Sequence, residues 1–423
     1  MGMKRLRYLL VLVVAAAVIV AFRIQNVSAD KVHSPEVDTV AFEAPKKEPL
    51  EIESVIREYD SIISSEIINS GTVGSALVIT YKDQVAFLKC YGVKKAGAKD
   101  SINKNTIFRL ASVSKTITGV LAGILDEEDI INLDDRVVDY LPDFRLKNSE
   151  STKHLTVRNL LSHTSGLIPH AYDNMVEEKV PLGKIMNDLC LVDVSASPGK
   201  LYGYQNVMFS LYDTIAALKT KKKFDEIIHE KVFEPFEMKT ASTGFRSFKN
   251  NPNKAFPHSG ANGNFRTLRL NDRYYSTAPA AGINASISDM AQFLLHLTNE
   301  NDSKIDDYIV QTVFTPQVQS PLRRTYLSRW DKVDSKQYAI GWRIIGYKGR
   351  KVAYHGGYVQ GYKTEIAYCE EENIGIAYLT NSPNAVASKT VPSFLNLLFK
   401  FTDQKTILTE NPVEESNSDQ GQS

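Results

Sequence analysis

The sequence lacks a surplus of charge of either sign. Fifty basic residues stand against 49 acidic ones among 423, so the formal net charge is +1. Such a balance provides no broad electrostatic surface for nucleic acid or for anionic lipid. We therefore expect a small or neutral partner and no nucleic-acid partner.

The chain is also poor in cysteine. Only Cys90, Cys190 and Cys369 are present, which excludes a framework of several disulfide bonds. A single bond between Cys90 and Cys369, both on predicted strands, is left open. The spacing of the cysteines and histidines fits no metal site, so no metal and no cofactor is expected. All three thiols are expected to be buried as small apolar groups.

The first residues of the chain differ in kind from the rest. Three basic residues precede an apolar run of 15 residues from Tyr8 to Phe22, and the small residues of 27–29 follow. This pattern is typical of a signal peptide, here predicted over 1–29. Because the run is shorter than the roughly 20 residues that span a bilayer, an uncleaved N-terminal anchor is the alternative. Both predict an exported protein of the periplasm or cell envelope, held at the inner membrane if the anchor is retained.

The remaining sequence divides into a linker at 30–50, a folded domain at 51–402 and a polar, disordered tail at 403–423. Helical periodicity appears at 51–68 and 391–401, near the two ends of the domain. Strand-like runs are predicted at 75–81, 84–92, 351–355, 363–370 and 373–381. Since strands lie at both ends and helices between, we expect an α+β fold. Its N- and C-terminal strands would form one antiparallel sheet, with helices on its faces and a helical subdomain.

The segment LASVSKTITG at 110–119 raises the question of a nucleophile. Ser112 opens a helical pattern, and Lys115 follows one turn later on the same face, so its amine can reach the hydroxyl. A helix N-terminus also favours negative charge that develops at the serine. Ser-x-x-Lys occurs four times in the chain, however, and the plainer interpretation is a helix cap followed by an exposed lysine. The lysine can accept the serine proton only where burial or nearby cations lower its pKa.

Further segments follow this one in a recognisable order. They are LLSHTSGL at 160–167, SPGKLYGYQN at 197–206, PAAGINASISDMAQFL at 279–294 and YHGGYVQGY at 354–362. Together with LASVSK they resemble the class C β-lactamase and penicillin-binding family of serine hydrolases, over roughly 55–400. The resemblance implies the β-lactamase/transpeptidase-like fold and catalysis through an acyl-enzyme.

The same resemblance implies roles for individual residues. Ser112 matches the acylated nucleophile, and Lys115 and Tyr204 match the groups that transfer its proton. Asn206 matches the amide that binds the carbonyl of the substrate. The oxyanion hole would be formed by the backbone N–H groups of Ser112 and Tyr358, each donor stabilising the transition state by about 3 kcal/mol.

The third motif departs from that of β-lactamases. His355, Gly356 and Gly357 stand where those enzymes carry Lys-Thr-Gly. A lysine suits a substrate carboxylate, whereas histidine at pH 7 is mostly neutral, so efficient β-lactam turnover is less expected. Esterases and peptidases of the family resemble this chain in carrying His-x-Gly. The glycines let the strand edge approach the substrate, and these three residues complete the predicted substrate-binding set with Asn206 and Tyr358.

The sequence thus predicts an exported serine hydrolase that cleaves an amide or ester through an acyl-enzyme on Ser112. A cell-wall D-alanyl peptide, another small peptide, a small ester and a β-lactam all stay open as substrates. The alternatives are a dedicated class C-like β-lactamase and a non-hydrolytic sensor of penicillin or peptidoglycan. His163 is expected to be structural and His170 shows no ligand spacing, while Tyr274 and Tyr275 lie in a region that could shape specificity.

Overall fold

The structure is a computed structural model, and it describes residues 51–299, 304–321, 327 and 329–410. The predicted signal peptide at 1–29, the linker at 30–50 and the last residues from 411 onward lie outside the described residues. Within the described ranges, no helix combines the length and the apolar character that crossing a bilayer requires.

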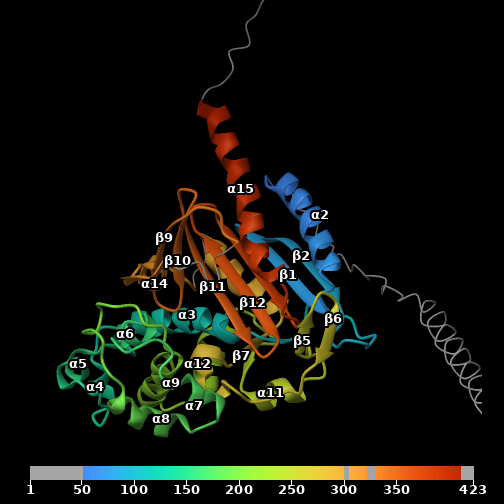
Figure 1. The fold of residues 1–423 in the computed structure, drawn as a ribbon. Helices are drawn as coiled ribbons and strands as arrows, with labels where there is room; N and C mark the ends of the chain where they lie inside the picture. The colour runs from blue at the N-terminus through green and yellow to red at the C-terminus, as the bar shows by residue number, and fades with distance from the viewer. Residues whose placement is uncertain (1–50, 300–303, 322–326, 328, 411–423) are drawn as a thin grey trace, which may run out of the picture. The chain divides into compact units, whose positions relative to one another are not determined.

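An eight-stranded antiparallel sheet forms the centre of the fold (Figure 1). Its strands, in spatial order, are β2 (Gln84–Gly92), β1 (Gly74–Tyr81), β13 (Ile374–Thr380), β12 (Tyr362–Cys369), β11 (Arg350–Val359), β10 (Arg343–Tyr347), β9 (Val333–Tyr338) and β8 (Val318–Gln319). Val78 of β1 lies opposite Ala377 of β13, so strands from the two ends of the domain are neighbours. The predicted α+β fold with one terminal sheet is confirmed.

The first and last helices of the domain cover one face of this sheet. α2 (Glu53–Asn69) and α15 (Ala387–Glu410) pack against each other there (Figure 1). α2 buries side chains at intervals of three and four residues, which is the spacing of one helical face. The ring of Tyr59 lies 5.2 Å from that of Phe394, and its hydroxyl donates to the carbonyl of Thr390.

α15 runs beyond the predicted end of the domain. The helix continues to Glu410, so the prediction that a disordered tail begins at 403 is wrong for its first residues. Asp403 pairs with Arg350 at 2.6 Å, and Lys405 pairs with Glu51. The side chains of Asp403 and Lys405 are therefore held by ion pairs on the surface of a helix.

The other face of the sheet carries the nucleophile segment. α13 (Ile287–Thr298) packs on β1 and β13, and Ser286 caps it by accepting the N–H of Asp289. α3 (Ser114–Glu127) follows the short 3₁₀ turn η1 (Ala111–Val113), which contains Ser112. A helix was predicted to open at Ser112; the observed α-helix starts two residues later, after this turn.

The middle of the chain forms a helical region beside α3, drawn mostly in green in Figure 1. Its elements are α4 (Val137–Tyr140), α5 (Ser149–His154), α6 (Val157–Leu161), α7 (Asp173–Glu177), α8 (Leu182–Asp188), η2 (Leu189–Leu191), α9 (Asn206–Thr220), α10 (Phe224–Ile228) and the π-helical η3 (His229–Phe233). The remaining elements are β3 (Phe108–Arg109), β4 (Ser242–Thr243), α11 (Phe245–Asn250), β5 (His258–Ala261), β6 (Asn264–Thr267), η4 (Tyr275–Thr277), α12 (Ala278–Ala281), β7 (Ile283–Ala285) and α14 (Asp307–Phe314). β3, β7 and β4 form one small sheet, and β5 and β6 form another.

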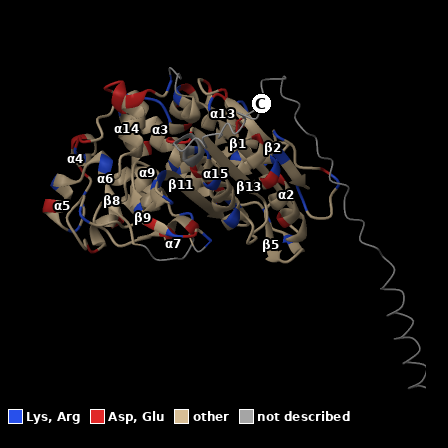
Figure 2. Cartoon of the chain, turned by 90° about the horizontal axis from the view of Figure 1, so that it is seen from above, with Lys and Arg blue, Asp and Glu red and all other residues tan. Residues whose placement is uncertain are grey.

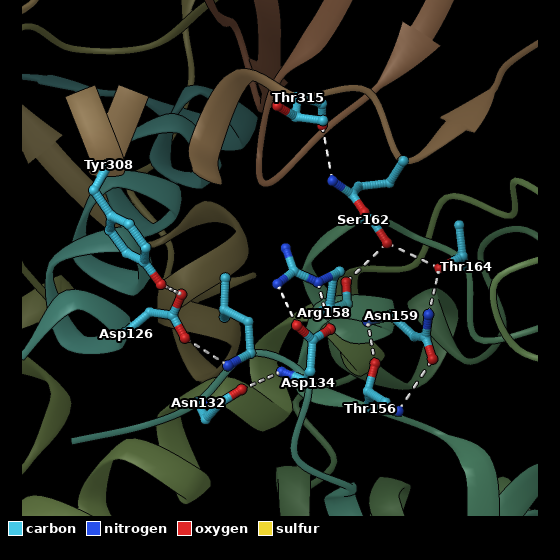
Figure 3. A network of polar contacts seen from close by, with 12 residues as sticks. Asp126, Asn132, Asp134, Thr156, Arg158, Asn159, Ser162, Thr164, Tyr308 and Thr315 are labelled. Carbon is cyan, nitrogen blue, oxygen red and sulfur yellow. Dashed lines mark hydrogen bonds and ion pairs between the residues drawn. The ribbon is translucent and has the colours of Figure 1, made fainter. Parts of the chain in front are cut away.

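A polar network holds the turn that follows α6 (Figure 3). Arg158 makes two hydrogen bonds of 2.7 Å to the carboxylate of Asp134. The hydroxyl of Ser162 donates to the carbonyl of Arg158 and lies 2.8 Å from that of Thr164, to which Asn159 also donates. The network thereby fixes the turn at 162–166, which supports the segment before α9.

The three cysteines are free thiols. Cys90 contacts the core on the α3 side of the sheet, whereas Cys369 lies in the core beneath α2 and α15, so they do not pair. Burial raises the pKa of both thiols to about 12, which leaves them unreactive. Cys369 is fully buried, whereas Cys90 and Cys190 are half-buried, so the prediction of burial is met in full only by Cys369.

Basic and acidic residues are mixed along the chain. Figure 2 shows both kinds over the helical region and over the sheet. Several form ion pairs on the surface, among them Lys231 with Glu128 and Arg136 with Asp139. This mixing agrees with the net charge of +1.

Candidate active site

A cavity of about 410 Å³ contains the predicted nucleophile. It is lined by Ser112, His170, Asp173, Glu177, Tyr204, Asn206, Arg273, Tyr274, Ala281, Tyr358, Val359 and Gln360. The structure thus brings together residues that are far apart in the sequence, from η1, α7, α9, β11 and the segment before α12. Four of the eight predicted site residues line this cavity, namely Ser112, Tyr204, Asn206 and Tyr358, and the other four do not.

The chain turns sharply just before Ser112. Ala111 has a φ of +49°, in the left-handed region that a non-glycine residue rarely adopts. The turn is held on both sides, because Leu110 donates to the carbonyl of Ile283 and accepts the hydroxyl of Thr364 at 2.7 Å. Backbone strain of this kind is often found at functional sites, and here it leaves Ser112 partly exposed to the cavity.

Lys115 is completely buried at the start of α3. Its Nζ donates to Oδ1 of Asn206 at 2.7 Å and to the carbonyl of Ala280 at 3.0 Å. Burial lowers the pKa of the amine well below its ordinary value; Asp173 acts in the opposite direction, and Arg343 lowers the pKa further. The structure therefore meets the condition under which a lysine can accept a proton near neutral pH.

Tyr204 lies between the predicted nucleophile and the side chains of Lys115 and Arg343. A side-chain hydrogen bond joins its hydroxyl to Ser112. The centre of its ring lies 4.7 Å from Nζ of Lys115 and 5.3 Å from the guanidinium carbon of Arg343. Burial raises the pKa of the phenol to about 12, while the charge of Arg343 and the hydrogen bond with Ser112 lower it. Tyr204 is thus placed next to both Ser112 and Lys115, the two groups that would exchange a proton.

Asn206 connects the buried lysine to the rim of the cavity. Its Oδ1 accepts from Lys115, and its Nδ2 donates to Oδ2 of Asp173 at 2.9 Å. The same carboxylate oxygen lies 2.7 Å from Nδ1 of His170. A continuous chain of hydrogen bonds therefore runs from Lys115 to His170. One N–H of the Asn206 amide is used in this chain, and the second can serve a substrate carbonyl.

His355 does not line the cavity, in contrast to its predicted role in substrate binding. Its side chain is fully buried, with Nε2 lying 3.1 Å from the hydroxyl of Tyr338 and Nδ1 lying 2.9 Å from the carbonyl of Gly356. Burial lowers the pKa of the imidazole well below its ordinary value, and Arg343 and Lys115 lower it further. The imidazole ring is short, so it stays behind the wall as a neutral group. The longer side chain of a lysine at this position, as in Lys-Thr-Gly, could extend toward the cavity.

The two glycines after His355 differ in their surroundings. A Cβ at Gly357 would lie 2.5 Å from the carbonyl oxygen of Leu110 and 3.1 Å from the nitrogen of Ser112. Only glycine permits this close approach of β11 to the nucleophile turn. A Cβ at Gly356 would meet only the hydroxyl of Tyr354, at 2.9 Å. The approach at Gly357 brings β11 against Ser112 just before Tyr358, as an oxyanion hole shared by Ser112 and Tyr358 requires.

His163 lies under Tyr204, with 4.3 Å between the ring centres. Its Nδ1 accepts the backbone N–H of Gln205, and burial lowers the pKa of the imidazole well below its ordinary value. Of the two tyrosines predicted to shape specificity, only Tyr274 lines the cavity, where its hydroxyl donates to Glu177. Tyr275 instead donates to the side chain of Asn284.

Other residues of the site were not predicted. Arg343 is 7% exposed and donates to the hydroxyl of Tyr202. The sequence contains a signal for Arg343, because this residue directly follows the segment YAIGW at 338–342. A Cβ at Gly341 of that segment (φ +75°) would lie 2.1 Å from the carbonyl oxygen of Lys115, so the segment must pack closely on α3. His170, Asp173, Glu177 and Arg273 belong to surface segments without a motif. In the described ranges, no three His, Cys, Asp or Glu residues are grouped so as to hold a metal ion.

Comparison with known proteins identifies the family and the fold. The beta-lactamase family model matches residues 52–395. Beta-lactamase-like protein 4 of Dictyostelium discoideum is 26% identical over 59% of this chain and 46% of its own, and protein flp of Staphylococcus aureus (strain MRSA252) is 22% identical over 79% and 64%. The chain thus spans about half to two thirds of the length of these relatives. The structure of an octameric penicillin-binding protein homologue from Pyrococcus abyssi superposes with a TM-score of 0.69 at 21% identity, covering 82% of this chain and 77% of that one. The predicted fold and family are confirmed, and the chain belongs to the beta-lactamase family.

Proposed function

We propose that the protein is a serine hydrolase that cleaves a small amide or ester through an acyl-enzyme on Ser112. The observation that carries this proposal is the buried Lys115, whose pKa is lowered and whose neighbour Tyr204 is hydrogen-bonded to Ser112. The plainer interpretation of Ser-x-x-Lys, a helix cap followed by an exposed lysine, does not fit an amine that is completely buried and is held by Asn206 and Ala280.

Acylation can proceed with the groups in place. Ser112 Oγ bonds to the carbonyl carbon of the substrate while its proton passes to Tyr204 and the neutral amine of Lys115. The carbonyl oxygen becomes an oxyanion, which the N–H groups of Ser112 and Tyr358 would stabilise. When the intermediate collapses, the bond to the leaving group breaks, and that group receives the proton through Tyr204. The enzyme groups are then neutral again and the acyl group stays on Ser112.

The cavity favours a small substrate. Its volume of about 410 Å³ fits a dipeptide-sized group or a small ester, and the exposed guanidinium of Arg273 at its rim suits a substrate carboxylate. Because His355 is held behind the wall, no group of the third motif provides the cation that Lys-Thr-Gly would supply. We therefore favour a small ester; a D-alanyl peptide and a β-lactam, which both carry a carboxylate, would depend on Arg273. The penicillin-binding homologue suggests penicillin as a probe of the nucleophile.

We also propose that the chain is exported. The basic residues and the apolar run at 1–29 support a signal peptide, with an uncleaved anchor as the alternative, and the domain would then act in the periplasm or cell envelope. The mass of the protein recovered from the envelope tests this. A start at Asp30 supports cleavage, a full-length mass supports the anchor, and recovery in the cytosol contradicts export.

The test of the hydrolase is the intact mass of the full chain during incubation with a penicillin and, separately, with p-nitrophenyl acetate. We expect an adduct in the wild type that Ser112→Ala lacks. Ser101→Ala is the matched control, because Ser101 and Lys104 have the same spacing on an exposed segment. A persistent penicillin adduct indicates a penicillin-binding peptidase, and rapid drug loss indicates a β-lactamase. If neither probe nor D-alanyl peptides are attacked, the non-hydrolytic sensor is favoured.

A further inference from the structure

A histidine–carboxylate pair at the rim of the cavity has no part in the acylation step. His170 Nδ1 lies 2.7 Å from Oδ2 of Asp173, and both residues line the cavity with Ser112. The side chain of His170 is 59% exposed, whereas that of Asp173 is 15% exposed. The pair therefore presents an accessible imidazole that is anchored by a largely buried carboxylate.

The contact with the carboxylate defines which nitrogen of the ring is available. With Asp173 as acceptor, Nδ1 carries the proton of the neutral ring, so Nε2 holds the lone pair. Nε2 has no hydrogen-bond partner within the described part of the chain. This is the arrangement of a general base that is oriented by a third group.

The backbone holds the imidazole next to the reaction centre. The N–H of His170 donates to the carbonyl of Tyr204 at 2.8 Å, and the centres of the two rings are 5.4 Å apart. His170 and Tyr172 both have φ near +60°, which costs a non-glycine residue roughly 1 kcal/mol or more. A simple surface ion pair does not require such a conformation, whereas a side chain that must be aimed into a cavity can.

Release of the acyl group needs a base that can contact a water molecule in the cavity directly. After acylation, Tyr204 is protonated, and with a pKa of about 12 it is a poor acceptor for a proton of water. Lys115 is completely buried, is bonded to Asn206 and Ala280, and does not line the cavity. Glu177 also lines the cavity, but its Oε1 accepts the hydroxyl of Tyr274, so its carboxylate is engaged with Tyr274 rather than with Tyr204. His170 is thus the lining group with a free acceptor nitrogen that is also near Tyr204.

We propose that His170 is a further catalytic residue, the general base that activates the water which releases the acyl group from Ser112, and that Asp173 is its positioning residue. The inference rests on the proposed function. In this step, water gives a proton to Nε2 of His170 as its oxygen bonds to the acyl carbon. The bond from the acyl carbon to Oγ of Ser112 then breaks. Oγ regains a proton that passes from the imidazolium through Tyr204, and a carboxylic acid leaves.

The experiment measures the two half-reactions separately with the full chain. p-Nitrophenyl acetate is mixed with enzyme, so that the first release of nitrophenol reports acylation and the steady rate reports deacylation. His170→Asn is the main variant, because asparagine tolerates the left-handed backbone. We expect the first phase to stay within about threefold of the wild type and the steady rate to fall about 100-fold, so that the acyl-enzyme accumulates on Ser112. Asp173→Asn should slow the steady rate less, about tenfold.

Controls separate this role from a structural one. His154→Gln removes an exposed histidine of α5 that does not line the cavity and should leave both phases unchanged. Free imidazole added to the His170→Asn protein should restore part of the steady rate, which no effect on folding would explain.

The other outcomes are decisive as well. Equal slowing of both phases would show that His170 positions the substrate and would overturn the inference, as would an unchanged steady rate. Failure of the proposed function is distinct, because it appears as the absence of any Ser112-linked adduct in the wild type and overturns both proposals together.

Discussion

The inner wall of the cavity and its outer rim hold their polar side chains in different ways. We use the term inner wall for Tyr204, which lines the cavity, together with Lys115 and His355 and the glycines beside it, which lie behind the lining, and outer rim for His170, Arg273 and Tyr358. Lys115 and His355 have no exposed surface, and burial moves their pKa values far from ordinary ones. Tyr358 is 65% exposed and the side chain of His170 is 59% exposed.

The difference separates two tasks. Groups of the inner wall are fixed by several neighbours each, so the proton-transfer chemistry cannot change without rebuilding the core around them. Two groups of the rim, His170 and Arg273, extend from loops, and Tyr358 extends from the end of β11; their exposed side chains can be exchanged at little cost in stability. The proton transfer of acylation therefore belongs to the wall, whereas the rim provides contacts to the substrate through Arg273 and Tyr358 and, through His170, the proposed release of the acyl group.

The largest effect is expected where the wall is tightest. Gly357→Ala places a Cβ against the carbonyl of Leu110, so β11 must move away from Ser112. A displacement near 1 Å costs about 100-fold in activity. The matched control is Gly356→Ala, whose Cβ meets only the end of the Tyr354 side chain. Acylation rates measured with p-nitrophenyl acetate should fall about 100-fold in the first variant and only a few-fold in the second. Equal losses would mean that the close approach is not what matters.

The second effect is on stability rather than rate. His355→Lys puts an ammonium where a neutral imidazole contacts Tyr338, and we expect a loss of about 3 kcal/mol in the free energy of unfolding. His355→Gln keeps a neutral hydrogen-bonding group and should cost about 1 kcal/mol. Urea unfolding of the two variants checks this. A lysine variant as stable as the glutamine one, with faster β-lactam hydrolysis, would restore the role in substrate binding that the sequence suggested for position 355.

Much of the wall could be predicted from the sequence, because close packing leaves local patterns. Gly357, and Ser112 with Lys115, occur in short segments whose order identified the family. The strands β1 and β13 were also predictable, since both are continuous apolar runs. β9 was not, because VDSKQY is polar and its pairing depends on β10 rather than on its own composition.

The rim could not be predicted in the same way. His170 is a single histidine in a loop, and its partner Asp173 and neighbour Tyr204 acquire meaning only when the chain is folded. The placement of His355 shows a different limit of prediction from sequence. Its motif was recognised correctly, but the sequence does not reveal whether a ring faces the cavity or the core behind it, because that is decided by Tyr338 across the sheet.

A smaller effect concerns the pH dependence of acylation, which requires neutral Lys115. Since burial lowers the pKa of this amine, the rate should hold through neutral pH and fall tenfold per unit below the pKa of Lys115. Arg343 lowers that pKa and Asp173 raises it. Arg343→Met should therefore move the acid limb to higher pH and Asp173→Asn to lower pH, each by roughly one unit. The exposed Arg136→Met is the control and should leave the limb in place. Shifts in the same direction for both variants would contradict this account of the lysine.

The smallest effects are expected at the rim. Arg273→Ala and Tyr358→Ala should each raise KM by at most about tenfold and leave kcat nearly unchanged, because both side chains are exposed and reach only the bound substrate. The two can be told apart with a pair of esters that differ only in a carboxylate. Arg273→Ala should weaken the anionic ester alone, whereas Tyr358→Ala should weaken both, since its ring offers contact rather than charge. A large fall in kcat for either variant would place that residue with the inner wall and remove the division of tasks between wall and rim.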